Sequence, residues 1–290
     1  MMLQLVTCTK RHAVNKPLTM TLTPDLLPTP SVHKAQIASR FSRAAGSYDS
    51  AAALQREVGH ELMQMASLPS QAKLNEPVLL DIGSGTGYFS QLWRERGLHV
   101  IALDLAEGML DFARNEGRAS SYICADMEAL PLADASVNYC FSSLAMQWSD
   151  DLATVLRECQ RVTVPGGLIL FSTLLQGTLH ELQAAWQGLD QQKHINHFLC
   201  KNEVNIALAQ AGIRHYHLNF SHKKVMYPGV VALMRDLKAI GANHRHGERN
   251  PGLGGKQQLA ELEQRYRERF EHQTMLPASY EVCCGVIVNE

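Results

Sequence analysis

The hydrophobic residues of this chain fall into short continuous runs separated by amphipathic stretches. A continuous apolar run is typical of a parallel strand that is covered on both faces. The runs lie at residues 78–80, 99–104, 122–127, 137–142 and 168–174. Between them, residues 88–96, 107–113 and 152–162 place apolar side chains every three or four positions, which predicts helices. The alternation predicts an α/β fold, an open and mostly parallel sheet with helices on both faces.

The chain before residue 78 has a different pattern. Residues 1–30 contain four prolines and no steady period, which predicts a flexible leader, unless the true start lies nearer Met20 or later. From Ser31 the pattern is helical, and a second helical piece is expected after Gly46. Residues 31–290 are predicted to form one domain, within which residues 176–200 look like an insertion placed over the active site.

The pattern after residue 200 adds further helices and a late strand pair. Residues 201–211, 229–240 and 256–271 have a helical period. Residues 213–225 alternate as an antiparallel strand does, and the apolar residues 280–288 end the chain as another strand. We therefore expect a late antiparallel strand beside the parallel part of the sheet.

Three alternating glycines follow the first apolar run, at Gly83, Gly85 and Gly87, shortly after Asp81. Glycine allows a positive φ and lets a ligand approach the backbone where a Cβ would intrude. The spacing differs from the GxGxxG fingerprint for dinucleotides, and no Lys-Ser/Thr pair follows that would make a P-loop. The sequence predicts a nucleoside-binding turn at the start of a helix, and the alternative is a glycine-rich turn without a ligand.

Acidic residues occur at the ends of the next two apolar runs. Asp104 follows the glycines at close to the roughly 20-residue spacing at which an acid accepts hydrogen bonds from ribose hydroxyls. A carboxylate suits this role because its two oxygens accept from both vicinal hydroxyls. Asp126 is a candidate acceptor for an adenine amino group. Met109 has two interpretations, packing on an adenine face or packing in the core.

The length and composition of the chain limit the classes of protein to which it can belong. With 290 residues, 46% of them hydrophobic, the chain is long enough to bury a full core. A net charge of -1 without a Lys/Arg-rich run predicts no nucleic-acid partner. Seven cysteines without a C-x-x-C pair predict reduced thiols in a cytoplasmic protein, and no run approaches the ~18 apolar residues of a membrane span. No histidine or cysteine pair has convincing ligand spacing, so no metal is predicted.

The motif from Asp81 to Gly87, with Asp104 and the pair Asp126-Met127, resembles the motifs of class I S-adenosylmethionine-dependent methyltransferases. The resemblance implies a Rossmann-like fold and S-adenosylmethionine as the methyl donor. It also implies a set of residues that contact this cofactor, which we take to be Asp81, Gly83, Gly85, Gly87, Asp104, Leu105, Met109, Asp126, Met127 and Ser142.

Other stretches point to one family within this class. The resemblance to that family extends from about Ser39 to the end of the chain. They are residues 43–49 with 54–55, 143–148, 175–179, 237–244 and 280–282. These stretches resemble the malonyl-acyl carrier protein O-methyltransferases of biotin synthesis. Members of that family methylate the free carboxylate of a malonyl thioester on acyl carrier protein, which lets the acyl group be elongated like an ordinary primer. The resemblance implies the same carboxyl O-methyltransferase activity, with malonyl-acyl carrier protein as substrate.

The substrate side of the site must hold a carboxylate, which requires a cation or convergent hydrogen-bond donors. The candidates are Tyr48, Gln147, Trp148 as a pocket wall, His197 and Lys238. Three of them have structural alternatives, because Tyr48 could be a half-buried tyrosine, Trp148 a core residue and His197 a polar loop residue. The family commonly has an arginine at the position of His197, which weakens a carboxylate-binding role there because histidine is only partly charged.

Two other functions fit the generic motifs. One is a small-molecule methyltransferase of the same fold that acts on a quinone or an aromatic acid, and the other is a cofactor-binding regulator without catalysis. An acidic carrier protein would require an exposed basic face on this chain. Its candidate residues are Lys193, Lys201, Arg235, Lys238, Arg245 and Arg249.

Overall fold

The computed structural model describes residues 31–66, 76–187, 189, 195–240 and 254–290. The predicted leader, residues 1–30, lies outside the described residues, as does part of the predicted insertion. The helices are α1 (Val32–Ala51), α2 (Ala53–Met65), α3 (Tyr88–Glu95), α4 (Glu107–Asn115), the short 3₁₀ helix η3 (Met146–Trp148), α5 (Leu152–Val162), α6 (His180–Trp186), α7 (Lys201–Gln210), α8 (Val230–Ala239) and α9 (Gly254–Phe270). The strands are β1 (Val78–Ile82), β2 (His99–Asp104), β3 (Ser121–Cys124), β4 (Val137–Ser143), β5 (Thr163–Leu175), β6 (Tyr216–Tyr227) and β7 (Leu276–Val288).

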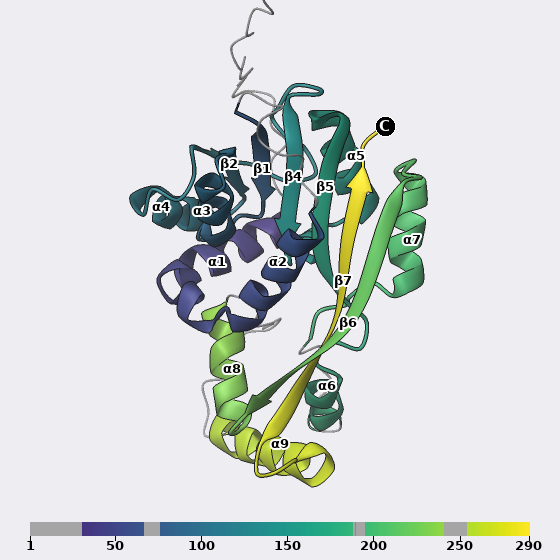
Figure 1. Ribbon diagram of the computed structural model, residues 1–290. Coiled ribbons are helices and arrows are strands. Elements are labelled where there is room, and N and C mark those ends of the chain that lie inside the picture. Colours follow the sequence, from purple (N-terminus) through teal and green to yellow (C-terminus); the bar gives the residue numbers. More distant parts are fainter. Residues whose placement is uncertain (1–30, 67–75, 188, 190–194, 241–253) are drawn as a thin grey trace, which may run out of the picture.

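The strands form a single 7-stranded sheet in the order β3-β2-β1-β4-β5-β7-β6 (Figure 1). Strands β1 to β5 are parallel, whereas β7 is antiparallel to both of its neighbours, β5 and β6. The predicted mostly parallel sheet with a late antiparallel strand is therefore confirmed. Strand β7 begins at Leu276, earlier than the predicted residue 280.

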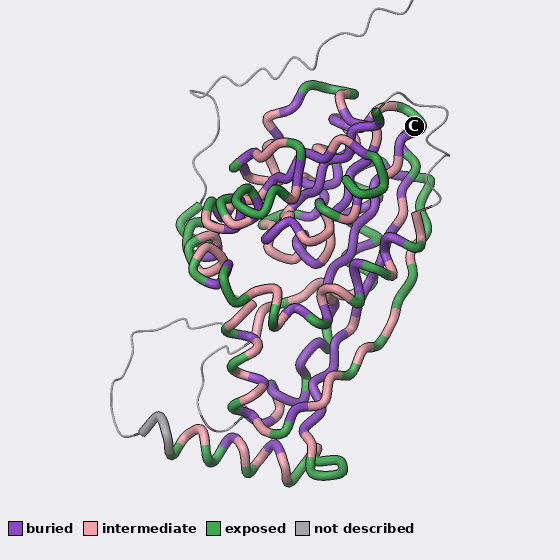
Figure 2. The backbone as a smooth tube through the Cα atoms, turned by 60° about the vertical axis from the view of Figure 1, so that its left-hand side comes forward, coloured by how far each residue is buried: buried purple, intermediate pink, exposed green. Residues whose placement is uncertain are grey.

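Helices cover both faces of the sheet, which explains the continuous apolar runs. On one face, Leu62 of α2, Trp93 of α3 and Leu110 of α4 pack in the same buried cluster as Leu79 of β1. The neighbouring strand residue, Leu80, packs on the other face in the cluster that contains helices α5 and α7. Successive strand side chains point to opposite faces, so a strand that is buried on both sides needs apolar residues at consecutive positions. Figure 2 shows the buried positions concentrated in the central strands.

Strands β6 and β7 extend past the other strands, and α6, α8 and α9 pack around this extension (Figure 1). Helix α6 belongs to the predicted insertion at residues 176–200. Two hydrogen bonds hold the segment against β7, since the Leu179 amide donates to the Ser279 carbonyl at 2.6 Å and the Ser279 amide donates to a Glu181 carboxylate oxygen at 3.1 Å. This extension lies beside the carboxyl edge of the parallel strands.

Helix α1 crosses that edge as one unbroken helix, so the predicted division at Gly46 is wrong. The helix begins after Ser31, whose hydroxyl accepts a hydrogen bond from the Lys34 amide, and the break falls at Ala52. Glycine inside a helix costs about 1 kcal/mol relative to alanine, which is less than the packing of one helix face provides. That packing includes the buried Ala44 and Ala45.

The pairing of β5 with β7 yields a prediction. Gly285 lies directly opposite the fully buried Phe171, and a Cβ at Gly285 would lie 2.2 Å from a ring carbon of Phe171. Gly285→Ala should lower the free energy of unfolding by about 1 to 3 kcal/mol, because the closely packed ring has no space to move into. In a double-mutant cycle by urea denaturation, Phe171→Leu should remove most of that loss. Gly46→Ala is the control, with open space at its Cβ and an expected gain of about 1 kcal/mol. Additive effects of the two substitutions at the strand pair would contradict the packing argument.

Candidate functional site

The glycine turn follows β1 and is fixed by backbone hydrogen bonds to β2. The amides of Gly83 and Ser84 both donate to the carbonyl of Leu103, at 2.8 and 3.0 Å. Gly83 has a φ of +66°, and a Cβ there would lie 2.3 Å from the Cβ of Ala145. Gly85 has a φ of +54°, and the position of its missing Cβ is open space. The turn therefore needs glycine at both positions and leaves room above Gly85.

Gly87 has a different role in the same turn. Its φ is +77°, and a Cβ would lie 3.0 Å from Ala113 and 3.1 Å from Arg118. It lines none of the cavities described below. This third glycine allows close packing at the start of α3.

Asp104 ends β2 beside the turn, and backbone donors hold its carboxylate. One oxygen accepts from the Gly85 amide at 2.8 Å and the other from the Ala106 amide at 2.7 Å. Burial raises the pKa of Asp104, while these hydrogen bonds act in the opposite direction. The carboxylate is thus oriented, and its remaining lone pairs face the adjoining cavity.

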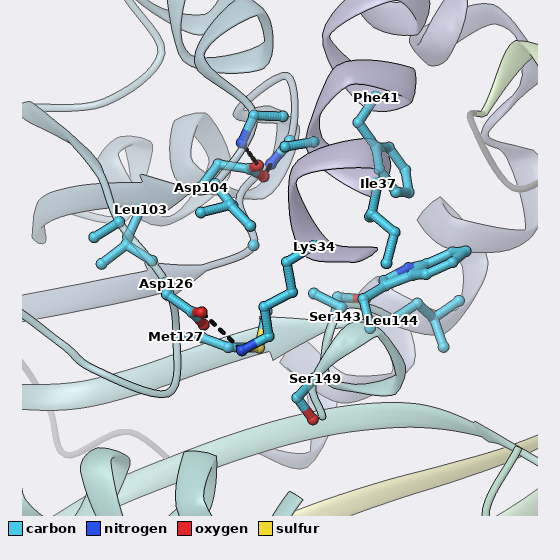
Figure 3. Close-up of a pocket in the computed structure, with 18 of the residues that line it drawn as sticks. Lys34, Ile37, Phe41, Leu103, Asp104, Asp126, Met127, Ser143, Leu144 and Ser149 are labelled. Carbon is cyan, nitrogen blue, oxygen red and sulfur yellow. Dashed lines mark hydrogen bonds and ion pairs between the residues drawn. The ribbon is translucent and has the colours of Figure 1, made fainter. Parts of the chain in front are cut away.

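That cavity, called cavity A, has a volume of about 720 Å³ and lies between α1 and the carboxyl ends of the strands (Figure 3). Its lining includes many of the residues predicted to contact the cofactor, with four additions from α1. The predicted residues are Gly83, Gly85, Asp104, Leu105, Asp126 and Met127, and the additions are Lys34, Ile37, Ala38 and Phe41.

Lys34 is a site residue that the sequence reasoning missed. Its ammonium group donates to Asp126 at 2.7 Å and to Glu128 at 2.6 Å, and its side chain is 7% exposed. Figure 3 shows it reaching from α1 to Asp126. One lysine in an amphipathic helix carries no sequence signal for this role, because only the tertiary fold brings it to acids about 90 residues away.

Asp49 was also missed, although it adjoins the predicted Tyr48. Its carboxylate accepts from the Thr86 hydroxyl at 2.5 Å and from the Arg118 guanidinium at 2.7 Å. Arg118 in turn donates to the Thr86 carbonyl at 3.0 Å. The three residues join the end of α1 to the glycine turn.

A second cavity, cavity B, has a volume of about 850 Å³ and adjoins cavity A. Tyr48, Phe41, Leu144 and Trp148 line both, and the ring of Trp148 meets that of Phe41 edge to face at 5.3 Å between centroids. The rest of its lining comes from the predicted insertion, α8 and nearby chain. It consists of Leu54, Gln55, Gln147, Leu174, Thr178, Leu179, Leu182, Ile195, Asn196, Phe198, Met234, Leu237, Ile240 and Tyr280.

Helices α1 and α8, which both line cavity B, are also linked directly. The Ser47 hydroxyl in α1 lies between two acceptors, the Ala44 carbonyl of its own helix at 3.2 Å and the Ala239 carbonyl at the end of α8 at 3.3 Å. The contact with Ala239 joins the part of the chain over the strand edge to the part that packs around the β6–β7 extension.

A third and smaller cavity, cavity C, has a volume of about 450 Å³ and lies beside the glycine turn. Asp81, Arg56, Ser84 and Gly85 line it, as does Tyr48. Tyr48 is thus the residue common to the linings of cavities A, B and C.

Four other predicted site residues line none of these cavities. Met109 is fully buried beside Ala45 and Ala106, and Ser142 is fully buried within β4, where its hydroxyl has no hydrogen-bond partner among the described residues. His197 and Lys238 are exposed. Their immediate neighbours in the chain, Asn196, Phe198 and Leu237, do line cavity B.

Within residues 31–66, 76–187, 189, 195–240 and 254–290, no group of three or more His, Cys, Asp or Glu side chains is arranged to hold a metal ion. No helix in the same ranges is long and apolar enough to cross a membrane.

The burial of Asp81 leads to a prediction about pH. Burial raises its pKa to about 7, with a contribution from the charge of Asp104, although the Ser90 hydroxyl donates to it at 2.5 Å and acts in the opposite direction. The folded state therefore binds a proton more tightly than the unfolded chain, so the stability that Asp81 contributes at low pH is lost as pH rises from about 4 to about 7. Asp81→Asn should remove this loss.

Denaturant titrations of both proteins across that range test the prediction. The free energy of unfolding of Asp81→Asn, relative to that of the wild type, should rise between about pH 4 and about pH 7 by at most about 4 kcal/mol. A difference that stays constant with pH would show that Asp81 does not titrate in this window.

Comparison with known proteins connects this geometry to a family. Residues 80–171 match the model of a methyltransferase domain. The malonyl-acyl carrier protein O-methyltransferase of Serratia marcescens is 49% identical over 260 residues, which cover 90% of this chain and 98% of that protein. The protein of the same name from Yersinia pestis is 48% identical, over 91% of this chain and 95% of its own length. The biotin biosynthesis bifunctional protein BioHC of Cellvibrio japonicus is 42% identical over 87% of this chain and 49% of its own length.

Solved structures share the fold at much lower identity. A protein of Bacillus halodurans assigned as a methyltransferase superposes with a TM-score of 0.57 at 20% identity, over 79% of this chain and 97% of its own. A phosphoethanolamine N-methyltransferase of Haemonchus contortus, solved with S-adenosylhomocysteine, has a TM-score of 0.54 at 14% identity, over 91% of this chain and 62% of its own. The class I methyltransferase fold is confirmed by this superposition and by the match to the methyltransferase domain. Identity of nearly one half over almost the whole of both chains shows that the protein belongs to the family of malonyl-acyl carrier protein O-methyltransferases.

Proposed function

We propose that this protein transfers a methyl group from S-adenosylmethionine to the free carboxylate of a malonyl thioester on acyl carrier protein. The product would be the malonyl methyl ester that primes pimeloyl formation for biotin synthesis. The observation that carries the proposal is the position of Tyr48, which lines all three cavities. A methyl group that passes between two ligands must do so where their sites meet, and the cavities adjoin at this residue.

Cavities A and C fit the two halves of the cofactor. In cavity A, Asp104 would accept from the ribose hydroxyls and Asp126 from the adenine amino group, with Leu105 and Met127 as apolar walls. In cavity C, Asp81 would face the α-ammonium group and Arg56 the α-carboxylate of the methionine part. S-adenosylmethionine supplies a methyl group activated by its sulfonium charge. Two features of this chain suit such a ligand. One is the open space at Gly85, and the other is the pair of oriented carboxylates in cavity A, those of Asp104 and Asp126.

Cavity B fits an acyl group with a polar end. None of its described lining residues is Lys, Arg or His, so the side chains there that can donate to a carboxylate are neutral. We assign this role to Tyr48, Gln147 and the amides of Gln55 and Asn196. Neutral donors orient a carboxylate while leaving its charge uncompensated, which keeps the oxygen a good nucleophile.

Catalysis by this site requires alignment more than proton transfer. A carboxylate is already ionised near neutral pH, so no general base is needed. Correct placement of two reacting groups contributes up to about 7 to 11 kcal/mol. Burial, together with the charges of Asp104 and Asp49, raises the pKa of Tyr48, so its hydroxyl remains a neutral donor at physiological pH. Trp148 would act as the wall that separates the reacting atoms from water.

The carrier protein would approach at the outer margin of cavity B. The exposed His197 and Lys238 fit contact with the carrier protein better than contact with the malonyl carboxylate. Lys201 and Arg235 are described and exposed, whereas Lys193, Arg245 and Arg249 lie outside the described residues. The predicted roles of Gly87, Met109 and Ser142 at the cofactor remain predictions, as do a cytoplasmic location and the lack of metal, nucleic-acid and membrane partners.

A transfer assay tests the function. Purified protein would be incubated with methyl-labelled S-adenosylmethionine and malonyl-acyl carrier protein, malonyl-coenzyme A or a free aromatic acid in parallel. Label that becomes alkali-labile ester on the carrier protein would support the proposal. The apolar lining of cavity B also favours a small-molecule acid as the acceptor, and label on the free acid alone would establish that alternative. Cofactor binding without any transfer would indicate a regulator.

Tyr48→Phe gives a prediction at the residue that the cavities share. The variant keeps the ring and removes the hydroxyl donor, so kcat should fall at least about tenfold while the Kd for S-adenosylhomocysteine changes less than about threefold. Steady-state kinetics and calorimetry supply the two values. Tyr216→Phe, at an exposed tyrosine of β6, is the matched control and should behave as the wild type. Unchanged kcat in Tyr48→Phe would remove its hydroxyl from the reaction.

A further inference from the structure

Lys34 is a buried cation in the first turn of α1. Its side chain is 7% exposed, and lysine is almost never buried without a partner of opposite charge. Burial acts to lower the pKa of Lys34, but its hydrogen bonds with Asp126 and Glu128 outweigh that effect and leave the pKa above its ordinary value. The ammonium group is therefore charged at any physiological pH.

The partners of Lys34 form an ordered network on one side of cavity A. Its ammonium group lies 2.7 Å from Asp126 Oδ2 and 2.6 Å from Glu128 Oε2. The other oxygen of Asp126 accepts from the Glu128 amide at 3.0 Å, and the other oxygen of Glu128 accepts from the Asp150 and Asp151 amides at 2.6 and 2.9 Å. Both carboxylates are thus held at each oxygen.

This arrangement orients the carboxylate of Asp126 but leaves some of its lone pairs without a hydrogen-bond donor from the protein. A carboxylate has about four lone-pair sites, and protein donors occupy two of those on Asp126. Lys34 and Asp126 both line cavity A, so the remaining sites of Asp126 are available to a ligand there (Figure 3). Without the lysine, Asp126 would lie close to the like charge of Glu128 and lose the bond that orients Oδ2.

We propose that Lys34 is a positioning residue that orients Asp126 toward the 6-amino group of adenine and so sets the purine selectivity of the methyl-donor site. The inference rests on the proposed placement of the adenosine half of S-adenosylmethionine in cavity A. A protein that uses this contact rejects a 6-oxo purine, because two acceptors, the purine oxygen and the carboxylate, then face each other. A lysine that only fastens α1 to the rest of the fold has no effect on that selectivity.

The test compares two ligands that differ at this one position, S-adenosylhomocysteine and S-inosylhomocysteine, each titrated into the full-length protein by calorimetry. The ratio of their dissociation constants is the readout, since general damage to the site changes both constants alike. The wild type should prefer the adenosyl ligand by at least about tenfold, as expected for a hydrogen bond to a charged group. Lys34→Met, which keeps the apolar stem, should reduce the ratio at least about fivefold.

Two variants control the comparison. Lys34→Arg retains the cation and should keep the ratio within about threefold of the wild type. Lys223→Met removes a similar lysine, which joins β6 to α2 by pairing with Glu57 and Glu61 and is 14% exposed. It should leave the ratio unchanged, because it lines none of cavities A, B or C. If Lys34→Met does not fold, Lys34→Gln takes its place, because the shorter glutamine side chain does not bring its amide within hydrogen-bond distance of Asp126.

The outcomes separate the inference from the function on which it rests. A ratio that falls in Lys34→Met and is retained in the two controls supports the inference. If Lys34→Met weakens the binding of both ligands equally, the inference is overturned and the proposed function stays intact. Lys34 would then serve only to attach α1 to the rest of the fold. A wild-type ratio near one overturns the orientation of Asp126 toward adenine. Failure of the wild type to bind either ligand overturns the inference together with the proposed function.

Discussion

The carboxylate of Asp49 attaches the end of α1 to the glycine turn, and α1 supplies walls to every cavity of the candidate site. Its two oxygens accept from the Thr86 hydroxyl and the Arg118 guanidinium, so the end of α1 is fixed where β1 passes into α3. Side chains of this helix line all three cavities. Without α1 the strand ends would form an open edge, and the acids there would face water. With α1 in place the edge is partly covered, so electrostatic interactions there are stronger than in open water.

Shielding the acids at the strand ends from water lowers the stability of the ligand-free protein. Asp81 and Asp104 lie at the carboxyl ends of neighbouring strands, Asp81 buried and Asp104 half-buried, and both have a raised pKa. Two neighbouring carboxylates of like charge, shielded from water, destabilise the empty site. Under the proposed function, a methyl donor with an ammonium and a sulfonium charge would compensate them, so the same feature that lowers the stability of the protein would favour binding of a cation.

The parts of this arrangement that were predictable from the sequence are those with a local signal. The strand runs, Gly83, Gly85 and the acids Asp104 and Asp126 each follow from a short pattern, and the structure places all four residues at cavity A. Residues with a tertiary role had no such signal. Lys34 meets its acids only after the sheet forms. Local propensity also suggested a break at Gly46, where packing of α1 instead keeps the helix continuous.

The Ser47 hydroxyl of α1 lies 3.3 Å from the Ala239 carbonyl of α8, so a helix that lines both cavity A and cavity B is in contact with another helix that lines cavity B. Phe41 and Tyr48 of α1 line cavity A and cavity B alike. A displacement of α1 would therefore alter the walls of both cavities at once.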